Sequence, residues 1–238
     1  MSKPLIISIE GNIGSGKSTF IKKLEEHWNS SSQLDEKRIF FLSEPVDEWL
    51  TIKDENDEHI LSKFYNDQEK YSFTFQMMAY ISRLNKLKEA IEMLKLKENA
   101  VIITERSLMT DKHVFAQMLY DEKKIEKIEF DIYNKWFDSF NKDTQIDKVI
   151  YISSNPNICF ERVKLRDRNG ESNIPLKYLT KCSEYHDNMI KKVKQENIDT
   201  MILDGNNNIF KDKDILSDWL KQVENIINNN NTNSLYLM

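Results

Sequence analysis

The chain has 238 residues, of which 39% are hydrophobic and 31% are charged, and its formal net charge is −5. These values are typical of a soluble globular protein, and no apolar run approaches the roughly 18 residues that a membrane helix requires. The negative balance argues against generic binding to nucleic acid or to anionic membranes, because such binding needs a basic face.

No linker rich in proline or glycine divides the chain, so we expect a single domain over residues 1–225. Residues 226–238 are rich in asparagine and too polar to bury a core, and we expect them to form a disordered tail. Cys159 and Cys182 lack the spacing of a zinc site, which favours free thiols in a reducing compartment. The first apolar run begins near residue 5 and leaves no room for a leader, so we expect a cytoplasmic protein, with the nucleus as the alternative.

Five short apolar runs predict buried parallel strands over residues 5–9, 39–42, 101–104, 149–152 and 201–203. Helical patterns fill the gaps between them, and the longest, over 71–96 and 125–140, indicate core or dimer helices. This alternation predicts an α/β fold, a doubly wound sheet of five parallel strands with helices on both faces. Since such sheets bind ligands at the carboxyl ends of their strands, we expect the site at that edge.

The first strand runs into the stretch IEGNIGSGKST, residues 9–19. It fits the spacing and the context of a P-loop, in which a glycine-rich turn joins a strand to a helix and cradles phosphate oxygens with backbone N–H groups. Lys17 is expected to meet the β- and γ-phosphates, and Ser18 to be a magnesium ligand. The residues expected to bind the triphosphate are Gly11, Asn12, Ile13, Gly14, Ser15, Gly16, Lys17, Ser18 and Thr19.

A P-loop alone leaves GTPases, helicases, kinases and transporter ATPases open. A GTPase reads guanine with an Asn-Lys-x-Asp motif, whereas Asn141-Lys142-Asp143 puts the aspartate one place too early. The Asp167-x-x-Gly170 segment imitates a switch motif, but it follows that stretch instead of preceding it. The GTPase interpretation therefore fails twice.

Four further segments share their order with a known family: SEPVDEW at 43–49, YSFTFQ at 71–76, ERS at 105–107 and RVKLRDR at 162–168. With the P-loop they resemble the deoxyribonucleoside kinases over roughly residues 5–215. The resemblance is strongest to the branch of deoxycytidine, deoxyguanosine and deoxyadenosine kinases. It implies a P-loop NTPase-type fold with an arginine-rich lid.

The resemblance implies a catalytic set of Glu44, Arg106 and Lys17. Glu44 is expected to be the base toward the sugar 5′-hydroxyl, and Arg106 to bridge that hydroxyl and the transferred phosphate. Glu105 ends an apolar strand, where it is expected to join Ser18 near magnesium. The alternatives are a surface carboxylate beside a turn for Glu44, and a mutual ion pair for Glu105 and Arg106.

Arg162 and Arg166 share one helical face, and with Arg168 they match the lid that closes over the triphosphate. Glu171 matches the lid carboxylate that reaches the sugar 3′-hydroxyl, with Tyr65 across the sugar. Phe210 belongs to a stretch that resembles the loop behind the donor base. This loop carries asparagines where relatives often carry acidic residues, which leaves the donor preference open.

Gln76, Ala79 and Arg83 share a helical face that can read a nucleobase, with Asp111 holding Arg83. Relatives that accept thymidine carry smaller or apolar groups in place of Arg83 and Asp111, so the resemblance favours cytosine or purine deoxynucleosides. The alternative is a plain core with an interhelix ion pair. The expected apolar and stacking walls of this substrate pocket are Val46, Trp49, Phe64, Phe75 and Phe115.

The sequence therefore predicts an enzyme that moves the γ-phosphate of ATP, with Mg²⁺, to the 5′-hydroxyl of a deoxyribonucleoside in nucleotide salvage. A nucleoside monophosphate kinase is the first alternative, although it needs extra cations near the acceptor, where Glu44 would repel a phosphate. A nucleotide-responsive binding protein is the second. The resemblance also implies a homodimer, and no nucleic acid or membrane partner is expected.

Overall fold

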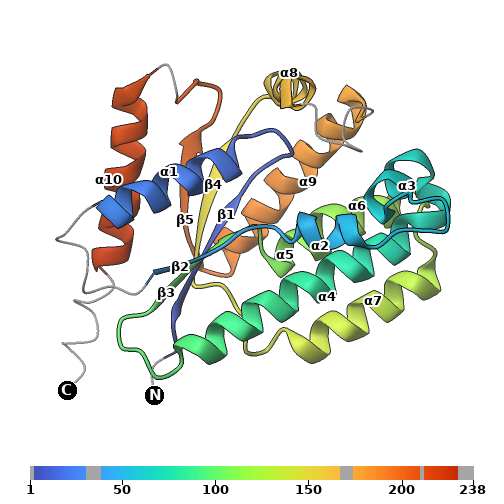
Figure 1. Ribbon diagram of the computed structural model, residues 1–238, viewed down its shortest axis with the longest axis horizontal. Coiled ribbons are helices and arrows are strands. Elements are labelled where there is room, and N and C mark those ends of the chain that lie inside the picture. Colours follow the sequence, from blue (N-terminus) through green and yellow to red (C-terminus); the bar gives the residue numbers. More distant parts are fainter. Residues whose placement is uncertain (1–2, 31–38, 167–173, 210–211, 230–238) are drawn as a thin grey trace.

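The computed structural model describes residues 3–30, 39–166, 174–209 and 212–229, and Figure 1 shows how their helices and strands are arranged. Three of the expected site residues, Arg168, Glu171 and Phe210, lie outside the described residues. Their roles therefore stay predictions.

Five parallel strands form one sheet, as the apolar runs predict. They are β1 (Leu5–Glu10), β2 (Ile39–Leu42), β3 (Val101–Glu105), β4 (Lys148–Ser153) and β5 (Asp199–Asp204), in the order β2-β3-β1-β4-β5. Every neighbouring pair is parallel, so all five carboxyl ends lie at one edge. The chain passes from β3 across β1 to β4, and the strand order therefore reverses beside β1, where doubly wound sheets bind their ligands.

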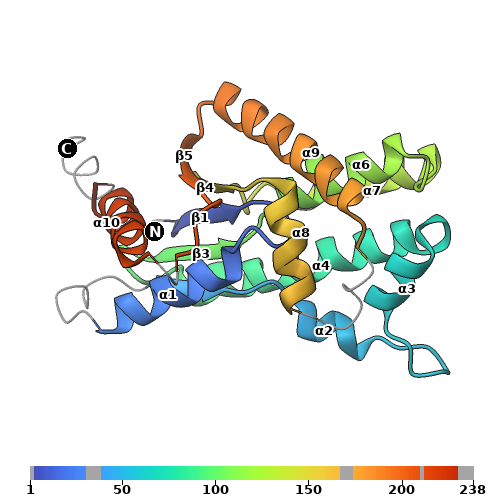
Figure 2. The same cartoon turned by 90° about the horizontal axis from the view of Figure 1, so that it is seen from above.

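Alternate residues of β1 face opposite helical layers, because successive side chains of a strand point to opposite faces. Ile7 and Ile9 pack with α1 (Lys17–Ser30) and α10 (Lys213–Asn229). Ile6 packs on the other face with α4 (Gln68–Leu94) and α9 (Leu176–Gln195). Both views show α10 on one side of the sheet and α4 and α9 on the other (Figures 1 and 2), which confirms the doubly wound fold.

Further helical segments lie between these elements along the chain. They are α2 (Val46–Thr51), α3 (Ile60–Asn66), α5 (Leu108–Thr110), the π-helix η2 (Asp111–Ala116), α6 (Gln117–Asp121), α7 (Lys127–Phe140) and α8 (Pro156–Arg166). The long helix α4 begins at Gln68 rather than at residue 71, because the Asp67 side chain caps it by accepting the backbone N–H of Lys70 at 3.2 Å.

Helix α10 continues to Asn229, so residues 226–229 of the expected tail are helical. Ile227 is buried in the core between the sheet and this helix, which gives the last turn an apolar anchor. Cys159 and Cys182 are both buried free thiols. Within the described ranges, no helix combines the length and the apolar character needed to cross a lipid bilayer.

Candidate active site

One cavity of about 460 Å³ opens at the carboxyl ends of the strands. It gathers most of the expected site residues from separate stretches of the chain: Ile13, Gly14, Ser15, Gly16, Lys17, Ser18, Thr19, Glu44, Val46, Trp49, Phe64, Tyr65, Phe75, Gln76, Ala79, Arg83, Glu105, Arg106, Asp111, Phe115, Arg162 and Arg166. Gly11 and Asn12 belong to the loop but do not line the cavity. The lining also includes residues outside the predicted set: Leu61, Leu165, Tyr178, Gly205, Asn207, Asn208, Ile209 and Trp219.

The loop between β1 and α1 has the backbone of a phosphate cradle. Gly14 has φ +78°, and a Cβ atom there would meet the Cys159 carbonyl oxygen at 2.5 Å, so only glycine fits. The Asn12 side chain donates to the Leu179 carbonyl at 2.8 Å and thereby ties the loop to α9. The Ser15 hydroxyl is buried and has no hydrogen-bond partner among the described residues. An unsatisfied hydroxyl in this cradle fits a ligand that supplies oxygen acceptors.

Lys17 lies within the cavity, where its ammonium donates to the backbone oxygen of Asn12 at 2.7 Å. Burial, followed by the nearby charge of Arg106, lowers the pKa of Lys17 to about 7, against the opposing pull of Glu105 and Glu44. A triphosphate in the cradle would return the full positive charge to Lys17, since an anion favours the protonated ammonium.

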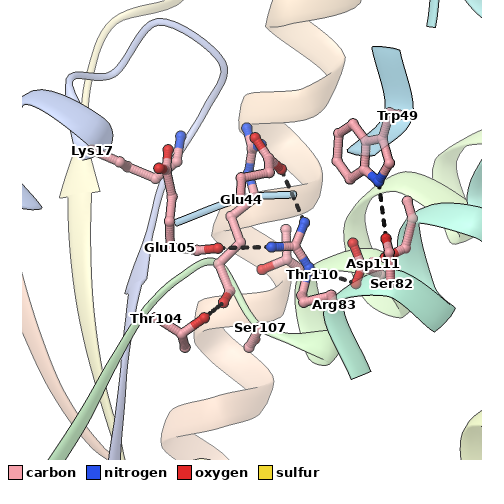
Figure 3. Close-up of polar contacts among 12 residues, drawn as sticks. Lys17, Glu44, Trp49, Ser82, Arg83, Thr104, Glu105, Ser107, Thr110 and Asp111 are labelled. Atoms are coloured by element: carbon pink, nitrogen blue, oxygen red, sulfur yellow. Dashed lines mark hydrogen bonds and ion pairs between the residues drawn. The ribbon is translucent and has the colours of Figure 1, made fainter. Parts of the chain in front are cut away.

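Glu44 joins two arginines from different parts of the fold, Arg106 and Arg83, and Figure 3 labels Glu44 and Arg83. Its Oε1 accepts Nη2 of Arg83 at 2.9 Å and Nη1 of Arg106 at 2.6 Å, while Oε2 has no contact of this kind in the described chain. The three side chains are 13%, 5% and 7% exposed. Burial would raise the pKa of Glu44, but the charges of Arg106, Arg83 and Lys17 outweigh it and hold the pKa well below its usual range. Glu44 is therefore a carboxylate with one oxygen available.

Arg106 has a left-handed backbone, with φ +63°, which is uncommon outside glycine. Its N–H donates to the Ile9 carbonyl at 3.0 Å, and its carbonyl accepts the Thr104 hydroxyl at 2.9 Å. Its guanidinium lies 5.1 Å from the centre of the Phe115 ring. These contacts fix the direction in which Arg106 leaves β3, since a strained conformation persists only where the surroundings determine it.

The two expected magnesium ligands lie together. The Ser18 hydroxyl donates to Oε1 of Glu105 at 2.7 Å, although 87 residues separate them in the sequence. In the described part of the chain no three His, Cys, Asp or Glu side chains form a metal cluster. The donor set therefore fits a hard cation that takes one carboxylate, one hydroxyl and ligands from a nucleotide.

The other end of the cavity is a polar wall built by α4 and η2. Nε of Arg83 donates to Oδ2 of Asp111 at 2.9 Å, and Nη1 donates to the Glu105 carbonyl at 2.7 Å. Burial raises the pKa of Asp111 to about 6, although Arg83 opposes this shift. Oε1 of Gln76 is buried and has no partner among the described residues. Two acceptor-bearing side chains thus line one wall of an otherwise aromatic pocket.

The aromatic walls are fixed partly by Ser82, which is not among the expected site residues. The Trp49 indole N–H donates to the Ser82 hydroxyl at 2.9 Å, and both residues are buried (Figure 3). The Trp49 and Phe75 rings pack edge to face, with their centres 5.3 Å apart, and the Phe75 and Phe64 rings stack with their centres 4.6 Å apart. A serine beside Arg83 in a helix gives no sequence signal of this contact.

At the phosphate-loop end of the cavity, the Arg162 guanidinium donates hydrogen bonds to backbone oxygens. Its Nη1 donates to the carbonyl oxygens of Gly205 at 2.8 Å and Ser15 at 3.3 Å, and its Nη2 donates to Asn207 at 3.0 Å. Arg162 therefore joins α8, the P-loop and the loop after β5. The residues at the end of α8 that line the cavity are Leu165 and Arg166.

Comparison with known proteins places these residues in a family context. A family model described as deoxynucleoside kinase matches residues 7–228. Human deoxycytidine kinase is 34% identical over 234 residues, covering 87% of this chain and 85% of that protein. A probable deoxycytidine kinase of fowlpox virus is 31% identical, covering 91% and 83%. A mitochondrial deoxyguanosine kinase of Xenopus laevis is 29% identical, covering 80% and 74%.

The Glu44→Gln variant tests the carboxylate at the centre of the site. It keeps the size of the side chain and removes its charge, so we expect kcat for phosphoryl transfer to a deoxynucleoside to fall by about 100-fold or more. The variant removes the carboxylate partner of Arg106 and one of the two carboxylate partners of Arg83, and we expect the free energy of unfolding to fall by up to about 3 kcal/mol.

Steady-state kinetics and thermal melting measure these two effects. Glu48→Gln, at an exposed carboxylate on the neighbouring helix α2, is the matched control and should change neither. Turnover of the Glu44 variant within about twofold of the native protein would remove Glu44 from the chemistry.

Proposed function

Because the chain belongs to the deoxynucleoside kinase family, we propose that it transfers the γ-phosphoryl group of ATP to the 5′-hydroxyl of a deoxyribonucleoside with a cytosine or purine base. It is a kinase that phosphorylates a nucleoside at the expense of a nucleoside triphosphate, a reaction of nucleotide salvage. One observation supports the proposal most: Glu44, in the turn after β2, and Lys17, at the start of α1, line the same cavity.

The proposed step is an in-line displacement. A bond forms between the sugar 5′-oxygen and the γ-phosphorus, the bond to the β,γ-bridging oxygen breaks, and the hydroxyl proton passes to Glu44. Oε2 of Glu44 is the oxygen without a protein contact in the described chain, which suits it to accept that hydroxyl. Its low pKa fits a late proton transfer, since phosphoryl transfer depends mainly on positioning and charge neutralisation.

Arg106 and Lys17 would neutralise the charge that develops during transfer. Arg106 contacts Glu44 and lies beside the cradle, so it can bridge the acceptor hydroxyl and the transferred phosphoryl group. Lys17 would hold the phosphates, and Arg162 and Arg166 would cover them from α8. Ser18 and Glu105 would hold Mg²⁺, which supplies positive charge to the phosphate oxygens.

The base preference is proposed from the polar wall. Gln76 Oε1 is a buried acceptor without a partner in the described chain, and the Asp111 carboxylate brings further acceptor atoms. An exocyclic amino group supplies donors, and cytosine, adenine and guanine each carry one. Thymine carries the O4 carbonyl in place of an amino group and offers only its N3–H as a donor at this edge, so it would leave at least one of these acceptors unpaired.

A nucleoside monophosphate kinase is less well supported. An acceptor that already carries a phosphate needs a free cation at its end of the site. Arg83 and Arg106 both lie near this end, but Glu44 and Asp111 already neutralise them. The buried cations are thus committed to carboxylates, which favours an uncharged hydroxyl as acceptor.

The family resemblance and an exposed apolar stripe together support a homodimer. Ile128, Ile132, Trp136 and Phe140 recur every four residues on α7 and are 66%, 40%, 46% and 39% exposed. Residues at this spacing lie on one helical face. A second copy of the same stripe offers an apolar partner across a twofold axis, since large exposed apolar patches usually mark interfaces.

A substrate panel tests the proposed reaction. Incubation with labelled ATP and each of the four deoxynucleosides should give 5′-monophosphates, with thymidine the poorest acceptor, and chelation of divalent ions should abolish the product. Deoxycytidine and deoxyadenosine monophosphates, supplied as acceptors in parallel, should give no diphosphate. Diphosphate formation alone would support the monophosphate kinase, and ATP hydrolysis without a phosphorylated nucleoside would support the binding protein.

The double variant Arg83→Met with Asp111→Ala tests the base preference. Removing both partners leaves no lone charge between them, and the Asp111 acceptors that disfavour thymine disappear, whereas Gln76 stays. We expect the thymidine-to-deoxycytidine ratio of kcat/KM to rise at least about tenfold, while kcat falls because Glu44 loses one arginine. Lys112→Met with Asp138→Ala breaks a more exposed ion pair and is the control. An unchanged substrate ranking in the first variant would make the Arg83–Asp111 pair structural.

The Trp136→Glu variant tests the dimer. A charge in the middle of the α7 stripe should convert the dimer to a monomer in light scattering coupled to gel filtration. Ile202→Glu introduces the same charge at a residue of β5 that is 52% exposed, and it should leave the dimer intact. A monomeric native protein, or two variants with the same mass distribution, would contradict the proposed interface.

A further inference from the structure

Glu10 is a buried carboxylate that the proposed reaction does not use. It is the last residue of β1, directly before the first glycine of the phosphate loop, and its exposed fraction is 0%. The ion pairs described for the site involve Glu44 and Asp111 but not Glu10. A buried carboxylate is retained in a core only where other groups stabilise it.

Three hydroxyl groups surround this carboxylate. Oε1 of Glu10 accepts the Ser8 hydroxyl and the Ser107 hydroxyl, each at 2.6 Å, and Oε2 accepts the Thr110 hydroxyl. Ser8 belongs to the same strand, so its hydrogen bond is local. Ser107 and Thr110 come from the segment that follows β3, so theirs join two separate parts of the site.

The segment held by Glu10 carries the acceptor side of the cavity. Ser107 immediately follows Arg106, and Thr110 immediately precedes Asp111 (Figure 3 labels Ser107, Thr110 and Asp111). Ser107 stands at the N-cap of α5 but makes no cap hydrogen bond with its side chain, because its hydroxyl is directed to Glu10. The hydrogen bond of Ser107 therefore lies next to Arg106, which contacts Glu44. The hydrogen bond of Thr110 lies next to Asp111, which contacts Arg83.

The backbone conformation of Arg106 depends on contacts of this kind. Its left-handed backbone, at φ +63°, persists only if neighbouring contacts determine it. The Ile9 carbonyl accepts its N–H at 3.0 Å, and Glu10 holds the next residue, Ser107. Two consecutive residues at the end of β1 thus bind two consecutive residues after β3. The same strand end continues into the phosphate loop at Gly11.

We propose that Glu10 is a positioning residue of the kinase reaction, whose two hydrogen bonds to Ser107 and Thr110 keep Arg106 and Asp111 in register with the phosphate loop. Glu10 is not among the residues that line the cavity, so it acts through its neighbours and not by direct contact with a substrate. It acts by linking the turn that holds the donor to the segment that holds the acceptor. This role rests on the proposed function, because it assumes that Arg106 and Asp111 serve phosphoryl transfer to a nucleoside.

A pair of Thr110 variants separates positioning from stability. Thr110→Val keeps the shape and removes the hydroxyl, whereas Thr110→Ser keeps the hydroxyl and removes a methyl group from a fully buried position. We expect Thr110→Val to lower kcat at least tenfold while KM for ATP changes less than threefold, and Thr110→Ser to keep kcat within threefold. Thermal melting should not reproduce this order, because the serine variant leaves a cavity.

Further variants locate the effect at Glu10. Glu10→Gln should lower kcat at least tenfold, and combining it with Thr110→Val should lower kcat little further, because both changes break the same link. Ser8→Ala is the matched control, since it removes a hydroxyl from the same carboxylate without touching the segment after β3, and its kcat should stay within threefold of the native value.

The outcomes separate this proposal from the function on which it rests. A native protein that phosphorylates no deoxynucleoside would overturn the function and the role of Glu10 together. An active native protein with native kcat in Thr110→Val and Glu10→Gln would overturn the role of Glu10 alone. Equal losses of kcat in Thr110→Val, Thr110→Ser and Ser8→Ala, each matching its loss of thermal stability, would make the hydroxyl cluster purely structural.

Discussion

The candidate site depends on one carboxylate that lies between two buried arginines. Glu44 follows β2, Arg106 follows β3 and Arg83 lies on α4, and Oε1 of Glu44 contacts both guanidinium groups. Without the Glu44 carboxylate, the buried guanidinium groups of Arg83 and Arg106 would repel each other at the carboxyl edge of the sheet. The interaction therefore fixes how α4 lies against the strand ends, and this placement gives the cavity its acceptor side.

The same network explains why few charges remain free in the acceptor half. Arg83 divides its donors among Glu44, Asp111 and the Glu105 carbonyl, so it orders three elements at once. Lys17, by contrast, has only a backbone oxygen of its own loop as hydrogen-bond partner in the described chain. At the nucleoside end of the cavity the arginines are paired with carboxylates, whereas the phosphate-loop end keeps the cation of Lys17. This asymmetry suits a polyanion at one end and an uncharged alcohol at the other.

The sequence predicts the sheet well because its signals are local. Each apolar run became a strand, and Glu44, Glu105 and Lys17 met because the carboxyl ends of parallel strands share an edge. The π-helical turn from Asp111 to Ala116 and the left-handed Arg106 have no such signal, since both are determined by tertiary contacts. Trp219 is remote in sequence from every motif, and it lines the cavity only because α10 packs back across the sheet.

Three neighbouring strands end in glutamate or are followed by one, and partners rather than residue type separate their roles. Among the described residues, the Glu10 side chain at the end of β1 accepts hydrogen bonds from hydroxyl groups alone, Glu44 after β2 contacts guanidinium groups, and Glu105 at the end of β3 accepts the Ser18 hydroxyl. Carboxylates of one kind thus have three different surroundings, which supports the three roles proposed for them: a positioning link for Glu10, an ion-paired proton acceptor for Glu44 and a cation ligand for Glu105. A sequence motif identifies the glutamates, and only the packed structure assigns their partners.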